Sequence, residues 1–186
     1  MKDVESPGGY EPYRRYPVGG MSVDFAAIGI ALLLWQGLGI ESLFGDLAVA
    51  ELIAVLFVAG PVVVAHEGTH YLAGRAQGLT PTVHWGLPTP YAVPLRQHVR
   101  RGQNLVVLLA PTVVLSGGAL VVGSQVASPL VQSVCGFVVL VNTACAAGDL
   151  VGAVWLAWQP PGTVVYLDTA QEGAHELYAR PESRRE

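Results

Sequence analysis

Four long runs of apolar residues constrain this chain most, because few water-soluble folds can bury them. They lie at about residues 21–40, 47–75, 104–123 and 129–158. A helix of about 20 apolar residues can cross the hydrocarbon core of a bilayer, which is roughly 30 Å thick. Charged residues make up only 13% of the chain, against roughly 25% in soluble domains. The sequence therefore predicts an all-α membrane protein with about four transmembrane helices, forming one domain over residues 21–160.

The segments outside these runs are expected to form two tails and one structured loop. Residues 1–20 are polar and rich in glycine and proline, which predicts a flexible N-terminal tail, and residues 161–186 are expected to form a C-terminal tail. Between the second and third runs, prolines separate Thr82–Trp85 from Tyr91–Val93. These two short pieces predict a β-hairpin-like loop between the second and third helices.

Prolines and glycines also predict irregularities inside the helices. Pro61 should kink the second helix one turn before its histidines. The fourth run ends at Pro160–Pro161, and at about thirty residues it is long for one crossing. It should therefore tilt, project beyond the bilayer, or loosen near Gly148 and Gly152.

The distribution of charge predicts the orientation in the membrane. With four spans, all ten lysines and arginines fall on one side, whereas the other side carries Glu41, Asp46 and Glu51. The positive-inside rule then makes both termini of this multi-pass cell-membrane protein cytoplasmic. A net charge of −4 with ten basic residues gives no surface for nucleic acid. The expected partners are the lipid bilayer and a membrane protein or peptide substrate, while the oligomeric state is not predicted.

The strongest chemical signal is the sequence His66-Glu67-Gly68-Thr69-His70 at the end of the second run. It fits the H-E-x-x-H pattern, in which histidines four residues apart share one face of a helix and bind a single zinc ion. The intervening glutamate reaches the water at the metal. Ionisable residues inside an apolar helix are costly unless they are paired or bound to metal. The plain alternative is that these residues only mark the helix end at the membrane interface.

A catalytic zinc ion needs a third protein ligand, and Asp149 is the best candidate. Both His66 and Asp149 lie nine residues before the cytoplasmic end of an inward-running helix, at Arg75 and Trp158. At about 1.5 Å per residue the two lie at one depth in the membrane. Asp168, in the C-terminal tail, is the rival ligand.

Asn142 precedes Asp149 by seven residues and is expected on the same helix face. It could bind a substrate carbonyl as part of the catalytic site. It could equally make a hydrogen bond between helices.

Several of these pieces resemble a known group, the zincin peptidase family of small multi-span membrane proteins, and more distantly the site-2 proteases. The matching pieces cover most of the chain from about residue 47, and they are Ala65–His70, Ala110–Pro111, Asn142 with Gly148–Asp149, and Pro161–Asp168. The resemblance implies that Asp149 is the third zinc ligand and that the loop from Thr80 is a membrane-associated hairpin. The chain departs from site-2 proteases in having Gly-Asp-Leu at residues 148–150, where they carry Leu-Asp-Gly.

These observations predict a membrane-embedded zinc metalloprotease that hydrolyses peptide bonds. His66, His70 and Asp149 would hold the zinc ion, which lowers the pKa of a bound water to about 7, and Glu67 would take the proton and pass it to the leaving amine. A substrate helix must unwind first, and the extended pieces of the loop could pair with it. The alternative is a metal-binding membrane protein without peptidase activity, either a pseudoprotease or a metal transporter.

Overall fold

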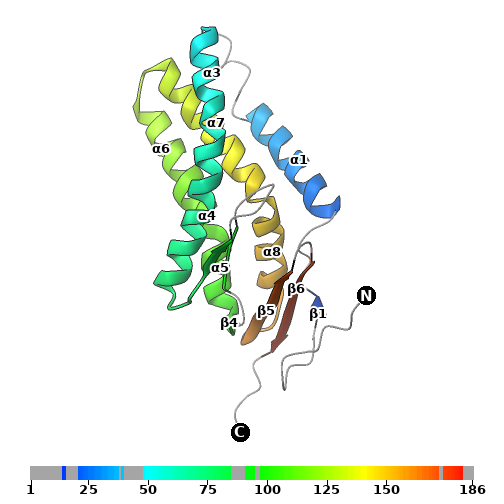
Figure 1. The fold of residues 1–186 in the computed structure, drawn as a ribbon. Coiled ribbons are helices and arrows are strands. Elements are labelled where there is room, and N and C mark those ends of the chain that lie inside the picture. The colour runs from blue at the N-terminus through cyan, green and yellow to red at the C-terminus, as the bar shows by residue number, and fades with distance from the viewer. Residues whose placement is uncertain are drawn as a thin grey trace.

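The computed structural model describes residues 14–15, 21–37, 39, 48–84, 91–94, 97–171 and 174–181. Helices make up most of it, and a small sheet lies at one end of the helical bundle (Figure 1). The helices are α1 (Met21–Gly37), α3 (Val49–Phe57), α4 (Ala59–Ala76), α5 (Arg101–Pro111), the π-helical turn η1 (Thr112–Ser116), α6 (Gly117–Gln125), α7 (Pro129–Cys145) and α8 (Ala147–Ala157).

Two stretches of helix are long and apolar enough to cross a membrane. They are Val49–Ala76, with 28 residues, and Arg101–Gln125, with 25 residues. A third crossing results if α7 and α8, which meet at an angle of 56°, are counted as one bent span. Helix α1 has 17 residues, short of the roughly 20 that a straight crossing needs. These helices are consistent with a membrane protein, and the four-span arrangement stays a prediction.

The helix breaks lie close to the positions expected from proline and glycine. Helix α3 ends at Phe57 and α4 begins at Ala59. Pro61 has no N–H, and its ring clashes with the carbonyl four residues earlier, that of Phe57. The break is therefore one turn before the proline. The fourth predicted helix is broken at Ala146, slightly before the glycines at which we expected it to loosen.

The sheet at the end of the bundle joins segments far apart in the sequence. Its antiparallel strands, in the order β1-β6-β5-β4, are β1 (Arg14–Arg15), β6 (Ala174–Pro181), β5 (Thr163–Gln171) and β4 (Val99–Arg100). Val165 pairs with Val99 and packs on Leu156, and both Val165 and Leu156 are buried. The sheet is thereby attached to α8. This differs from the expectation of two plain tails, because Arg14–Arg15 and most of residues 163–181 are paired strands.

The loop that follows α4 is directed back along that helix. Gly78 has a φ of 76°, and the N–H of Leu79 donates to the Gly74 carbonyl at 3.0 Å, as in a Schellman cap. Gly74 allows a close approach, since a Cβ there would lie 3.2 Å from Pro81 Cγ. Thr80 and Gln97 then close the base of the loop with two hydrogen bonds of 2.9 Å.

Within this loop, two short strands pair antiparallel. They are β2 (Thr82–His84) and β3 (Tyr91–Val93), with Val83 opposite Ala92. Trp85 and the rest of the connection, residues 85–90, lie outside the described residues. Strand β3 lies against α4 and so reaches the part of that helix that carries the H-E-x-x-H residues.

Candidate metal centre

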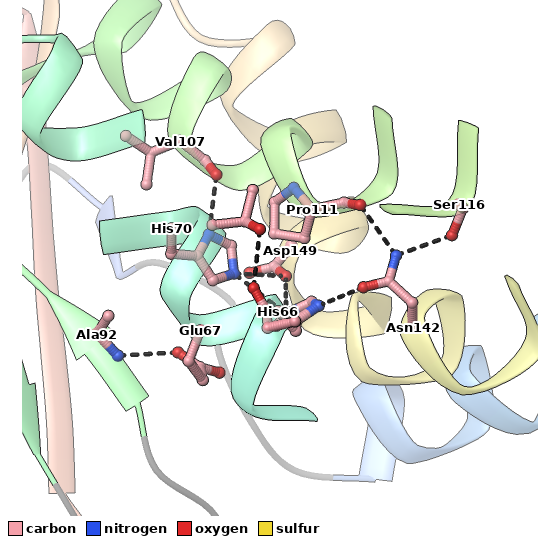
Figure 2. A network of polar contacts seen from close by, with 11 residues as sticks. His66, Glu67, His70, Ala92, Val107, Pro111, Ser116, Asn142 and Asp149 are labelled. Carbon is pink, nitrogen blue, oxygen red and sulfur yellow. Dashed lines mark hydrogen bonds and ion pairs between the residues drawn. The ribbon is translucent and has the colours of Figure 1, made fainter. Parts of the chain in front are cut away.

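Two histidines on one face of α4 form the centre of the site. His66 and His70 lie one helical turn apart, as the i, i+4 spacing requires, and both are buried, with 3% and 6% of their surface exposed. Their rings are nearly perpendicular, at 83°. The two Nε2 atoms are 3.1 Å apart (Figure 2). Both imidazoles therefore present the same nitrogen to one point.

Asp149 approaches this point from the first turn of α8. Its Oδ2 atom lies 3.2 Å from His66 Nε2 and 3.1 Å from His70 Nε2 (Figure 2). The break at Ala146 separates it from α7 and gives α8 a direction of its own. As a result, Asp149 meets one side of the His66 ring while a residue of α7 meets the other side.

That residue of α7 is Asn142, which is fully buried. Its Nδ2 group donates to the Pro111 carbonyl at 3.0 Å and to Ser116 Oγ at 2.8 Å. Its Oδ1 atom lies 3.0 Å from His66 Nδ1 and is an acceptor, so that nitrogen carries the proton. A neutral His66 therefore has an unprotonated Nε2 atom.

The same reasoning fixes the tautomer of His70. Its Nδ1 atom lies 2.8 Å from the Val107 carbonyl oxygen, which can only accept a hydrogen bond. The proton is thus on Nδ1, and the lone pair of Nε2 points toward His66 and Asp149. A backbone carbonyl or side-chain oxygen bound to the far nitrogen is the usual way in which metal-binding histidines are oriented.

Three acceptor atoms therefore converge with separations of 3.1–3.2 Å. One proton on either imidazole could pair with Asp149, yet it would leave the other Nε2 lone pair without a partner. A divalent cation satisfies all three atoms together. Tetrahedral zinc with bonds of about 2.0–2.1 Å separates its ligand atoms by about 3.3 Å, and this triangle nearly matches that spacing. The residues present thus fit a zinc ion by both chemistry and size.

Glu67 lies beside this triangle, on the side of the loop. Its Oε2 atom accepts the backbone N–H of Ala92 in β3 at 2.8 Å (Figure 2). The ligand atoms of His66, Glu67 and His70 all lie within 4.8 Å of one another, so these three also form a possible metal set. The set with Asp149 is tighter, and its oxygen contacts both imidazoles. By distance, Asp149 is therefore the better placed of the two candidates for a third ligand.

The structure brings together most of the residues singled out in the sequence. His66, His70 and Asp149 meet as expected, and Glu67 lies next to them. Of the two roles left open for Asn142, the structure favours the hydrogen bond between helices. Its amide donates both hydrogens, to the Pro111 carbonyl and Ser116 Oγ, which leaves none for a substrate carbonyl. The side chain of Asp168, the rival ligand, lies outside the described residues, although its backbone is part of β5.

Two contributors were not identified from the sequence, namely the carbonyls of Val107 and Pro111. Every residue has a backbone carbonyl, so the residue types do not show which carbonyl binds a histidine. The available signal was Pro111 itself, a proline in the middle of a predicted membrane helix, which must leave one carbonyl without its helical donor.

Comparison with known proteins assigns the chain to a family. No curated protein and no solved structure matches it. A family model described as "Putative zincin peptidase" matches residues 60–164, which is more than half of the chain and includes every residue of the triangle. Zincins are zinc peptidases of the H-E-x-x-H type, so the family implies zinc as the cofactor and a metallopeptidase as the activity. The chain belongs to this zincin peptidase family.

Proposed function

We propose that this protein is a membrane-embedded zinc metalloprotease that hydrolyses peptide bonds of membrane-associated substrates. The observation that carries the proposal is the convergence of His66 Nε2, His70 Nε2 and Asp149 Oδ2 at separations of 3.1–3.2 Å. In this proposal His66, His70 and Asp149 are the zinc ligands, and Asn142 orients the imidazole of His66.

The bound zinc ion would supply Lewis acidity, which polarises a peptide carbonyl and lowers the pKa of water. Glu67 would take a proton from the attacking water on its carboxylate oxygen and return it to the leaving nitrogen as the peptide bond breaks. Its position one residue after His66, with its carboxylate within 4.8 Å of the ligand atoms of both histidines, supports this assignment.

The edge of β3 that faces away from β2 supports the binding of an extended substrate. Ala92 is opposite Val83 of β2, and its N–H points to Glu67, so this edge of the strand faces the site. Adding a strand to a sheet edge is a common way to bind a peptide in extended form. We propose that an unwound segment of the substrate pairs with β3 next to Glu67.

The proposed topology is that of a multi-pass protein of the cell membrane with both termini in the cytoplasm. Strands β1 and β4 carry Arg14, Arg15 and Arg100, and they lie at the same end of the bundle in Figure 1. Such clustering of basic residues on one side supports the orientation given by the positive-inside rule.

The test is a paired measurement of zinc content and cleavage in liposomes that contain a reporter transmembrane segment. The wild-type protein should bind one zinc ion and cut the reporter, whereas Glu67→Gln should bind zinc equally and not cut. Glu51→Gln, which changes a glutamate in the first turn of α3, is the matched control and should cut normally. A wild-type protein that binds zinc without cutting would identify a pseudoprotease or another metal-binding protein.

A further inference from the structure

Pro111 lies four residues after Val107 in the third apolar stretch. In an α-helix the carbonyl of residue i accepts the N–H of residue i+4. Proline has no N–H, so the Val107 carbonyl has no helical donor. That same carbonyl accepts the Nδ1–H of His70 at 2.8 Å.

We infer that Pro111 is a positioning residue for the metal centre, because its missing N–H reserves the Val107 carbonyl for His70. The inference rests on the proposed metal site and adds to it a residue that touches neither metal nor substrate. Val107 is buried and Pro111 is fully buried, so bulk water cannot replace either partner. An N–H at position 111 would draw the carbonyl back along the axis of α5, away from α4.

The irregular helix at Pro111 also helps to orient His66. After Pro111 the chain takes the wider π-helical turn η1, in which the N–H of Gly117 donates to the carbonyl of Thr112, five residues earlier. The Pro111 carbonyl accepts Asn142 Nδ2 at 3.0 Å, and Asn142 in turn holds His66. The carbonyls at the two ends of one turn, residues 107 and 111, therefore orient both imidazoles. Isolated π turns of this kind are frequent at functional sites.

The decisive test compares two substitutions that differ in a single backbone group. Pro111→Ala introduces an N–H, whereas L-lactic acid at position 111, inserted by nonsense suppression, carries the same methyl group with an ester oxygen in place of N–H. Zinc affinity should fall roughly 10–100-fold in the alanine variant, the usual effect of losing a partner that orients a metal ligand, and should stay near the wild-type value in the lactate variant. Pro129→Ala, at the first turn of α7 where the N–H has no helical partner, should bind zinc normally.

A second pair keeps the inference testable if the alanine variant does not fold. Replacing Leu108 by its α-hydroxy analogue turns the Val107 carbonyl into an ester carbonyl, which is a weaker acceptor. The same replacement at Leu109 weakens the Leu108 carbonyl instead, as a control. Zinc should bind more weakly to the first protein than to the second, and ¹⁵N NMR should show a weakened Nδ1–H hydrogen bond at His70 only in the first.

The outcomes separate the inference from the proposed function. Equal zinc affinities within either pair, with zinc bound by the wild type, would overturn the role of Pro111 and leave the metal site in place. A wild-type protein that binds no zinc would overturn the proposed function, and the inference with it.

Discussion

Ala92 donates its backbone N–H to Glu67 Oε2 at 2.8 Å, so the edge of β3 and the acidic residue of the H-E-x-x-H turn are in direct contact. Within the described residues this sheet has two strands, β2 and β3. A substrate strand that pairs with β3 would compete with Glu67 for the Ala92 N–H. In the proposed binding mode, substrate binding and release of the Glu67 carboxylate would thus be linked through one backbone group.

Replacing Ala92 with proline tests this link. Proline removes the N–H that both Glu67 and an added strand would use. A hydrogen bond to a charged group contributes about 1.5–3 kcal/mol, so we expect kcat/KM for a reporter substrate to fall about tenfold or more. Zinc affinity should not change, and Ala92→Gly, which keeps the N–H, should retain most activity. Unaltered kinetics of the proline variant would place the substrate elsewhere.

Asp149→Asn should remove the third zinc ligand. The neutral amide is a poor zinc ligand. We therefore expect zinc affinity to fall by more than the roughly 10–100-fold loss that follows mutation of a residue that only orients a metal ligand. Zinc titration of Asp149→Asn and Asp168→Asn, side by side, distinguishes the two candidates. If Asp168→Asn loses zinc and Asp149→Asn retains it, the ligand set given above is wrong.

Asn142→Leu should disturb the metal centre without touching the metal. It removes the partner of His66 Nδ1–H and the side-chain donor to the Pro111 carbonyl, at a cost of about 1–3 kcal/mol for each buried group that stays unpaired. Ser116 Oγ keeps its bond to Thr143. We expect lower thermal stability and zinc affinity reduced roughly 10–100-fold.

The control for Asn142→Leu is Thr143→Val. Thr143 is buried on the same helix and bonds to Ser116 Oγ at 3.0 Å, and its loss should affect zinc affinity much less. A raised KM for Asn142→Leu with unchanged zinc affinity would instead indicate that Asn142 binds substrate.

Removal of zinc should lower the stability of the folded protein. A ligand present at 100 times its Kd stabilises the folded state by about 2.7 kcal/mol. Thermal unfolding in detergent should therefore shift to lower temperature after treatment with a chelator and recover when zinc is restored. Asp149→Asn should show little of this shift. If the unfolding temperature of the wild-type protein changes with neither chelator nor added zinc, the proposed metal site is wrong.

The side chains of the site were largely predictable from the sequence, since helical spacing alone sets His66 and His70 on one face. Asp149 could be matched to His66 by depth, because each lies nine residues before the predicted end of its helix, at Trp158 and Arg75. The partners of the far nitrogens were not predictable in the same way. For His70 the partner is the Val107 carbonyl, which Pro111 leaves without its helical donor. For His66 it is Asn142, which is held by the Pro111 carbonyl beside a π-helical turn. Neither arrangement follows from hydrophobic periodicity.

The four-stranded sheet was not predicted from the sequence. β1 has two residues and β4 has two, too few for alternation to be recognised, and their pairing with β6 and β5 joins segments more than sixty residues apart. Val164 and Val165 were visible as apolar residues in a polar tail. Both are buried, and the packing of Val165 on Leu156 of α8 depends on long-range contacts that local sequence does not encode.

The bend between α7 and α8 has a mechanical consequence. Asn142 lies before it and contacts one nitrogen of the His66 ring, while Asp149 lies after it and contacts the other. If the 56° angle opened or closed, the two contacts would be pulled in different directions, and one rigid ring could not follow both. The imidazole of His66 thus connects α7 to α8, and a change in the angle between these two helices would strain its contact with Asn142 or with Asp149.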